Sequence, residues 1–199
     1  LGRKGALPAW RDAVLFKTAY AWGLRRNEVR RLQRVDFAPN PKAREFGRFG
    51  VVAVRYGKAH RGSAHKRRGV LTVFDWAVEV MAQWVSEGLP LFGDSVIDVF
   101  PSGHGGLVAG AVGDRFRRYR EELGLDAGLD LHSLRRSYVT HLIEDGFDPL
   151  FVQHQVGHEH ASTTSLYTCV SSDFRTRSLR TALDRSISEA MRVPGEASS

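Results

Sequence analysis

The most informative segment of this chain covers residues 131 to 142 and reads Leu131-His132-Ser133-Leu134-Arg135-Arg136-Ser137-Tyr138-Val139-Thr140-His141-Leu142. Leu134, Tyr138 and Leu142 recur at intervals of four, which predicts an amphipathic helix that begins near His132 and stops at Gly146. His132 and Arg135 lie three residues apart at its start, so they share one face. Because a helix N-terminus attracts anions, this pair is suited to hold a phosphate. Taken alone, His-x-x-Arg more often marks a capping histidine and a surface arginine.

The rest of the sequence predicts a mainly α fold with one small antiparallel β-sheet (α+β). Residues 50–56 and 70–74 are rich in β-branched side chains and are predicted to pair as strands. The remaining elements are predicted as helices, because their apolar residues recur at helical spacing and glycines or prolines mark their ends. These predicted helices are Pro8 to Gly23, 27 to 34, 75 to 88 with Asp75 as N-cap, 112 to 124, 149 to 157, one capped by Ser162 that carries Tyr167, and an amphipathic segment from Phe174 to Ile187. Residues 101–106 are predicted as a loop.

The composition favours a polyanionic partner. The chain has 29 Lys and Arg, 24 of them Arg, against 22 Asp and Glu, for a net charge of +7. The planar guanidinium fork of Arg matches phosphate oxygens, so nucleic acid is the leading candidate, although a basic surface alone does not establish it. Cys169 is the single cysteine, which fits a reducing cytoplasm. No apolar run is long enough to span a membrane. We therefore expect a cytoplasmic, nucleoid-associated protein.

A basic hairpin is predicted between the two strands. From Arg55 to Phe74 the sequence contains no Asp or Glu. Such a hairpin can lie against a DNA backbone or enter a groove. A solvated loop is the alternative. The basic side chains expected to contact DNA here are Arg61, Lys66, Arg67 and Arg68.

Two further clusters carry chemically useful side chains. Arg25 follows the helix stop at Gly23, and Glu28 is placed to hold its guanidinium. Gly157-His158 ends one predicted helix shortly before Tyr167. The histidines at 154, 158 and 160 have spacings of four and two, but apart from Glu159 no nearby cysteine or carboxylate completes a recognised metal motif. We therefore expect no metal and no cofactor.

Together these clusters resemble the conserved boxes of one family. The segment Ala21-Trp22-Gly23-Leu24-Arg25-Arg26-Asn27-Glu28-Val29 resembles the first arginine box of tyrosine recombinases, and residues 131–142 resemble the second. Residues 156–168 are similar to the family's segment from Gly-His to Tyr-Thr. His158 follows Arg135 by twenty-three residues and precedes Tyr167 by nine, as is typical of the family. The resemblance covers about residues 10 to 180 and indicates a tyrosine recombinase, or phage-type integrase, catalytic domain.

The resemblance implies a site and a reaction. Its catalytic residues would be Arg25, Lys58, His132, Arg135, His158 and the nucleophile Tyr167. The two arginines would clamp the scissile phosphate, and no metal or ATP would be required. Lys58 fits the general acid best, with Lys66 as an alternative because the hairpin is longer than usual. Arg136 stands where a histidine is frequent and is expected to contact DNA.

The resemblance also implies partners and domain organisation. We expect residues 1–180 to form the catalytic domain and residues 181–199 a tail, partly helical and then disordered. The segment from about 171 to 191 would dock onto a neighbouring subunit or onto its own domain. An N-terminal DNA-binding domain is expected to be absent from this chain, and the full-length protein is expected to act as a homo-tetramer on double-stranded DNA, with a monomer as the alternative for this chain alone.

The expected activity is integration or excision of a mobile element. The alternatives are a type IB topoisomerase or telomere-resolving enzyme, a DNA-binding relative without catalysis, and a histidine-dependent metalloenzyme.

Overall fold

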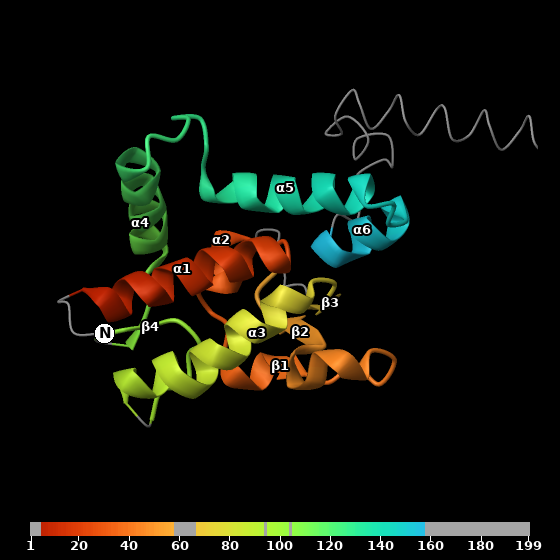
Figure 1. Cartoon of the computed structure of the whole chain (residues 1–199), viewed down its shortest axis with the longest axis horizontal. Helices are drawn as coiled ribbons and strands as arrows, with labels where there is room; N and C mark the ends of the chain where they lie inside the picture. Colours follow the sequence, from red (N-terminus) through yellow and green to blue (C-terminus); the bar gives the residue numbers. More distant parts are fainter. Residues whose placement is uncertain (1–4, 58–66, 94, 104, 158–199) are drawn as a thin grey trace, which may run out of the picture.

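The computed structural model describes residues 5–57, 67–93, 95–103 and 105–157 of the chain (Figure 1). Within these ranges the protein is mostly helical, as the sequence predicted, and it contains two small antiparallel sheets where one was predicted. The regular elements are α1 (Ala6–Ala21), α2 (Arg26–Val29), β1 (Phe37–Ala38), β2 (Val51–Val54), β3 (Arg68–Leu71), α3 (Asp75–Gln83), β4 (Pro101–Ser102), β5 (Gly105–Gly106), α4 (Ala109–Glu122), α5 (Leu131–Glu144) and α6 (Pro149–Val156). Short helical turns add Arg34–Asp36, Arg44–Phe49, Trp84–Gly88 and Leu89–Phe92. The predicted segments around Tyr167 and from Phe174 to Ile187 lie outside the described residues.

Helix α1 forms the centre of the fold. It buries Val14, Leu15 and Ala19 and contacts α3 on one side and α5 on the other (Figure 1). The helix ends at Ala21, and Gly23 follows with a φ of 55°. A Cβ on Gly23 would lie 2.5 Å from the Tyr138 ring of α5, so the turn that leads to α2 requires glycine.

A three-stranded antiparallel sheet in the order β1-β2-β3 packs on the same core. Val52 and Val70 face each other in register and are fully buried. The predicted second strand, 70–74, was wrong in its extent, because β3 runs from Arg68 to Leu71. Thr72 follows the end of the strand: its backbone N–H donates to the Gly50 carbonyl at 3.0 Å, and its hydroxyl donates to the Phe49 carbonyl and accepts a hydrogen bond from the Trp22 indole at 3.0 Å.

Three other predictions differ from the structure, besides small shifts at the starts of α1 and α4. Phe74 is the N-cap of α3, so Asp75 is the first helical residue and not the cap. The helix predicted over 27–34 ends after one turn at Val29, because the following chain pairs with residues 97–99 through the hydrogen bonds Arg34 N to Ile97 O and Val99 N to Leu32 O. The loop predicted at 101–106 contains the short hairpin of β4 and β5.

Helices α5 and α6 pack against each other; α5 also contacts α1, and α6 contacts β3 (Figure 1). Asp130 caps α5 by accepting a hydrogen bond from the Ser133 backbone N–H at 2.8 Å. Asp148 caps α6 in the same way. Gly157 ends α6 in the left-handed conformation, which confirms the predicted stop. No helix within the described ranges is long and apolar enough to cross a membrane.

Candidate active site

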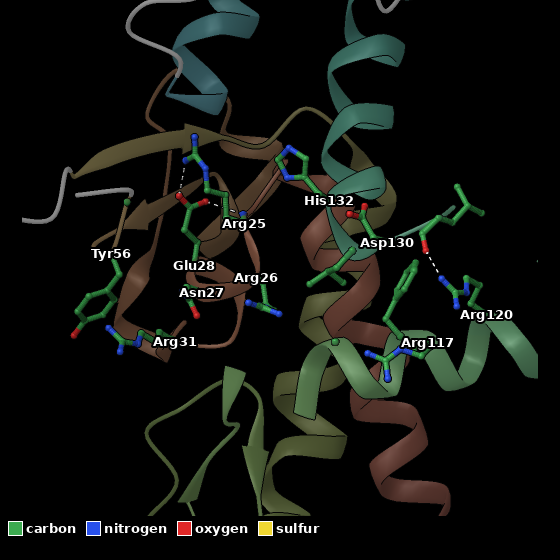
Figure 2. A pocket seen from close by; sticks show the side chains of 15 residues that line it. Arg25, Arg26, Asn27, Glu28, Arg31, Tyr56, Arg117, Arg120, Asp130 and His132 are labelled. Carbon is green, nitrogen blue, oxygen red and sulfur yellow. Dashed lines mark hydrogen bonds and ion pairs between the residues drawn. The ribbon is translucent and has the colours of Figure 1, made fainter. Parts of the chain in front are cut away.

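A basic pocket of about 780 Å³ lies between α2, α4 and the start of α5 (Figure 2). Arginines dominate its polar lining, and Glu28 and Asp130 are the two carboxylates in it. The charged and imidazole side chains that line it are Arg25, Arg26, Arg31, Arg117, Arg120, His132, Glu28 and Asp130. An excess of guanidinium groups around one hollow favours an anionic ligand.

Arg25 enters this pocket from the turn between α1 and α2. It is the N-cap of α2, with an extended backbone, and its side chain is 25% exposed. Its guanidinium Nη1 donates to Glu28 Oε1 at 2.9 Å, and its backbone N–H donates to Glu28 Oε2 at 2.8 Å. The predicted role of Glu28 in holding the Arg25 guanidinium is therefore confirmed.

Glu28 is the buried centre of an arginine cluster. Arg68 binds its carboxylate with both ends of the guanidinium, Nη1 to Oε1 and Nη2 to Oε2, each at 2.9 Å. Arg135 Nη1 lies 4.0 Å from Oε2. Burial alone would raise the pKa of Glu28, but the hydrogen bonds and charge of Arg68, followed by the hydrogen bonds of Arg25, lower it to about 2. The carboxylate is therefore ionised at neutral pH and keeps the arginines together.

Arg135 lies behind the pocket wall. Its side chain is fully buried, with Nη1 donating to the Gly23 carbonyl at 2.6 Å and Nη2 donating to the Val156 carbonyl. Burial, and then the positive charge of Arg25, lower the pKa of Arg135 to about 9, so it stays charged at neutral pH. A guanidinium has more N–H donors than these two carbonyls engage. Arg135 thus ties the turn before Arg25 to the last residue of α6.

His132 lines the pocket from the first turn of α5, close to Arg25 (Figure 2). Partial desolvation of the ring, and then the charges of Arg135 and Arg136, lower the pKa of His132. Its imidazole is therefore mostly neutral at neutral pH and able to accept a proton. The structure brings Arg25, His132 and Arg135 into one region, although only the first two reach the pocket surface.

The other predicted site residues divide into three groups. Arg68, predicted to contact DNA, is only 14% exposed and binds Glu28 instead. Arg67 and Arg136 are exposed, and Arg136 donates to Ser133 Oγ at 2.6 Å. Five residues lie outside the described part of the chain: Lys58, Arg61, Lys66, His158 and Tyr167. Gly57, the last described residue before Lys58, lines the pocket.

Helix α4 supplies a pocket wall that the sequence analysis missed. Arg117 and Arg120 line the pocket from this helix (Figure 2). Arg120 is held by hydrogen bonds to the carbonyls of Ala127 and Leu129, whereas Arg117 is 62% exposed. Their spacing of three residues places both on one helix face, and this is the signal that could have identified them.

Metal ligands do not gather in the described residues: no three His, Cys, Asp or Glu side chains there are close enough to hold an ion. Of the three histidines at 154, 158 and 160, only His154 lies in a described range.

Comparison with known proteins identifies the family. The phage integrase family pattern matches residues 5–173. The chain is 30% identical over 172 residues to the tyrosine recombinase XerC of Halalkalibacterium halodurans, covering 82% of this chain and 51% of that protein. It is 31% identical over 163 residues to XerD of Ralstonia nicotianae, covering 80% and 48%. The chain thus spans about half the length of these relatives.

Solved structures show the same fold. The XerH site-specific recombinase bound to its difH substrate in a pre-cleavage complex superposes with a TM-score of 0.63 at 22% identity, covering 90% of this chain and 48% of that one. XerA recombinase gives 0.62 at 19% identity, covering 86% and 62%. The chain therefore belongs to the phage integrase family of tyrosine recombinases and has the fold of their catalytic domain.

Proposed function

We propose that this chain is the catalytic domain of a site-specific recombinase that cleaves and rejoins DNA through a 3′-phosphotyrosyl bond to Tyr167. The observation that carries the proposal is the pocket in which Arg25 and His132 lie together, backed by Glu28 and Arg135, in a chain of this family. Such a group of charges suits phosphoryl transfer, in which the protein must position the reactants and stabilise charge on the phosphate oxygens.

In the proposed cleavage step, the Tyr167 phenol attacks the scissile phosphorus in line with the 5′ oxygen of the next nucleotide. A tyrosine–phosphate bond forms, and the bond from phosphorus to that 5′ oxygen breaks. Arg25 stabilises the non-bridging oxygens from the pocket surface, Arg135 adds its positive charge from behind the pocket wall, and His158 donates a hydrogen bond to the phosphate. His132, whose pKa is lowered, accepts the phenol proton.

The departing 5′ oxygen receives a proton from the hairpin lysine, Lys58 or Lys66. Attack by a 5′ hydroxyl from another strand then reverses the chemistry and releases the Tyr167 phenol. The phosphotyrosyl bond conserves the energy of the broken phosphodiester, so rejoining consumes no ATP.

Double-stranded DNA is the proposed substrate. The DNA contacts proposed from the sequence are Arg61, Lys66, Arg67 and Arg136, and the α4 arginines add positive charge to the pocket. Arg68, also expected among them, binds Glu28 with both ends of its guanidinium. Among the structural neighbours, XerH was solved with difH DNA and the Tn1549 transposon integrase with transposon right-end DNA. Integration or excision of a mobile element, by a homo-tetramer of the full-length protein in the cytoplasm, is the finer proposal.

A nicked suicide substrate tests the reaction directly. Loss of the short fragment beside the nick traps the enzyme, so the wild-type chain should form a covalent protein–DNA adduct. Tyr167→Phe should bind DNA with unchanged affinity and form no adduct. An adduct at normal yield in this variant would remove Tyr167 from its role, and DNA binding without any adduct in the wild type would favour a non-catalytic relative. Relaxation of supercoils without strand exchange would favour a topoisomerase.

The general acid is identified by leaving-group rescue. Lys58→Ala and Lys66→Ala are compared on a substrate with sulfur in place of the bridging 5′ oxygen. A thiolate leaves without a proton, so the variant that lacks the acid should recover cleavage on sulfur, while the other variant should behave like the wild type on both substrates. Rescue of neither variant would assign the proton to another group.

A further inference from the structure

Arg68 occupies a different position from the one expected of a DNA contact. Its side chain is 14% exposed and its guanidinium faces inward. Both ends bind the Glu28 carboxylate, and Nε donates to the Gln155 carbonyl at 3.0 Å. We infer that Arg68 is a positioning residue for strand cleavage, which fixes Glu28 and thereby Arg25, and joins both to the end of α6. This inference rests on the proposed function.

The first step of the argument concerns the carboxylate. Each carboxylate oxygen of Glu28 accepts one hydrogen bond from Arg68 and one from Arg25, so the two arginines fix the orientation of the carboxylate. Without Arg68, the buried carboxylate would lose two charge-assisted hydrogen bonds. Arg135, 4.0 Å away, is the nearest replacement cation. Its guanidinium would then be drawn away from the Gly23 and Val156 carbonyls, which disturbs the proposed phosphate clamp.

The second step concerns the end of α6. The Gln155 side-chain amide is hydrogen-bonded to β3: it accepts a hydrogen bond from the Leu71 N–H and donates one to the Leu71 carbonyl, each at 2.9 Å. A Cβ on Gly157 would lie 3.0 Å from Arg68 Cδ, so the stem of Arg68 packs directly against this residue. His158 is the next residue in the chain. Arg68 therefore contacts both the arginine cluster and the peptide that precedes a proposed catalytic histidine.

The third step concerns the basic hairpin. Arg68 is the first residue of β3, and residues 58–66, which include both proposed lysines, precede it closely in the sequence. One guanidinium thus links the turn that carries Arg25 to two segments that adjoin proposed catalytic groups, the strand after the hairpin and the end of α6. A displacement of about 1 Å at reacting groups can lower a rate by about 100-fold.

Three roles for Arg68 make different predictions. A DNA contact would, when removed, weaken DNA binding and reduce its salt dependence, without changing the cleavage rate of the bound complex. A purely structural residue would lower stability, and its folded variant would cleave normally. A positioning residue would leave affinity nearly unchanged and lower the cleavage rate at saturating DNA.

The test uses Arg68→Gln and Arg68→Lys in the full chain. Single-turnover adduct formation is measured on the suicide substrate at saturating DNA, and Kd is measured by fluorescence anisotropy at two salt concentrations. We expect Arg68→Gln to lower the rate by about 100-fold with Kd within about 3-fold of wild type. Arg68→Lys keeps the charge but lacks the two-ended geometry, so it should recover only part of the rate. Arg44→Gln removes a charge from an exposed position and serves as the matched control.

The outcomes separate the inference from the function on which it rests. If the wild type forms the adduct and Arg68→Gln matches its saturated rate, only the positioning role is overturned, and a weaker Kd would make Arg68 a DNA contact. If Arg68→Gln does not fold, the lysine variant carries the test, and a fully wild-type rate in it would overturn the role. Absence of any wild-type adduct would instead refute the proposed function, and the positioning role with it.

Discussion

Replacing Glu28 by glutamine removes the negative charge on which Arg25, Arg68 and Arg135 converge, while keeping the size of the side chain. Glu28 is 3% exposed, and its pKa is lowered from an ordinary 4.5 to about 2. That lowering corresponds to about 3 kcal/mol of stabilisation of the folded chain at neutral pH. The amide NH₂ of glutamine would also face a guanidinium, so a loss of at least this size is expected for Glu28→Gln.

The loss should depend on pH in a defined direction. Because the pKa of Glu28 in the folded chain lies below its ordinary value, the stabilisation is complete above about pH 4.5 and disappears as the pH falls towards 2. The difference in the free energy of unfolding between wild type and variant should therefore be constant from pH 7 to about 5 and shrink at pH 3.

Urea denaturation followed by circular dichroism measures this difference at each pH. Glu122→Gln is the matched control: its carboxylate is 58% exposed and pairs with Arg118 at 3.5 Å, so its loss should be below about 1 kcal/mol. If Glu28→Gln were as stable as this control at pH 7, the carboxylate would not hold the cluster together. A difference that grew on acidification would contradict the assigned pKa direction.

Three further predictions concern the same region. Gly23→Ala should lower the free energy of unfolding by about 2 kcal/mol or more, because the new Cβ would clash with the Tyr138 ring and the backbone φ is positive. Gly110→Ala is the control: a Cβ there has nothing within 4 Å, so the same urea titration should show little effect. Arg135→Lys should lose most adduct formation on the suicide substrate, since an ammonium cannot replace the guanidinium fork, and near-normal cleavage would count against the clamp. Since the pKa of His132 is lowered, the cleavage rate should be constant from pH 8 to about 6.5 and fall only below that, where the imidazole becomes protonated. If the same fall at low pH persisted in His132→Ala, the titrating group would be another residue.

Local signals in the sequence predicted the helices well and the sheet less well. Gly23 and Gly157 marked helix ends because only glycine takes these positive φ values without strain. The second strand was misplaced because Val73 and Phe74 read as strand residues, yet both pack against the α5–α6 core instead. That choice depends on packing between distant segments, which periodicity within a short window does not report.

The candidate site divides in the same way. Arg25, Glu28 and His132 were predicted from spacing within single turns or helices, and the structure places them around one pocket. The contact between Arg68 and Glu28 joins residues forty apart in the sequence and could not be inferred from either segment alone. The arginines of α4 were missed because an amphipathic helix with a charged face is ordinary, and only the fold shows that this face lines the pocket.

Gln155 has a consequence for the behaviour of the protein at high concentration. β3 is the outer strand of its sheet, and outer strands with free N–H and C=O groups invite pairing with a second molecule. The Gln155 amide occupies both outward groups of Leu71, as a neighbouring strand would. This side chain thereby blocks intermolecular β-pairing at Leu71, so solubility and aggregation should respond to changes at position 155 even where the rate of strand cleavage does not.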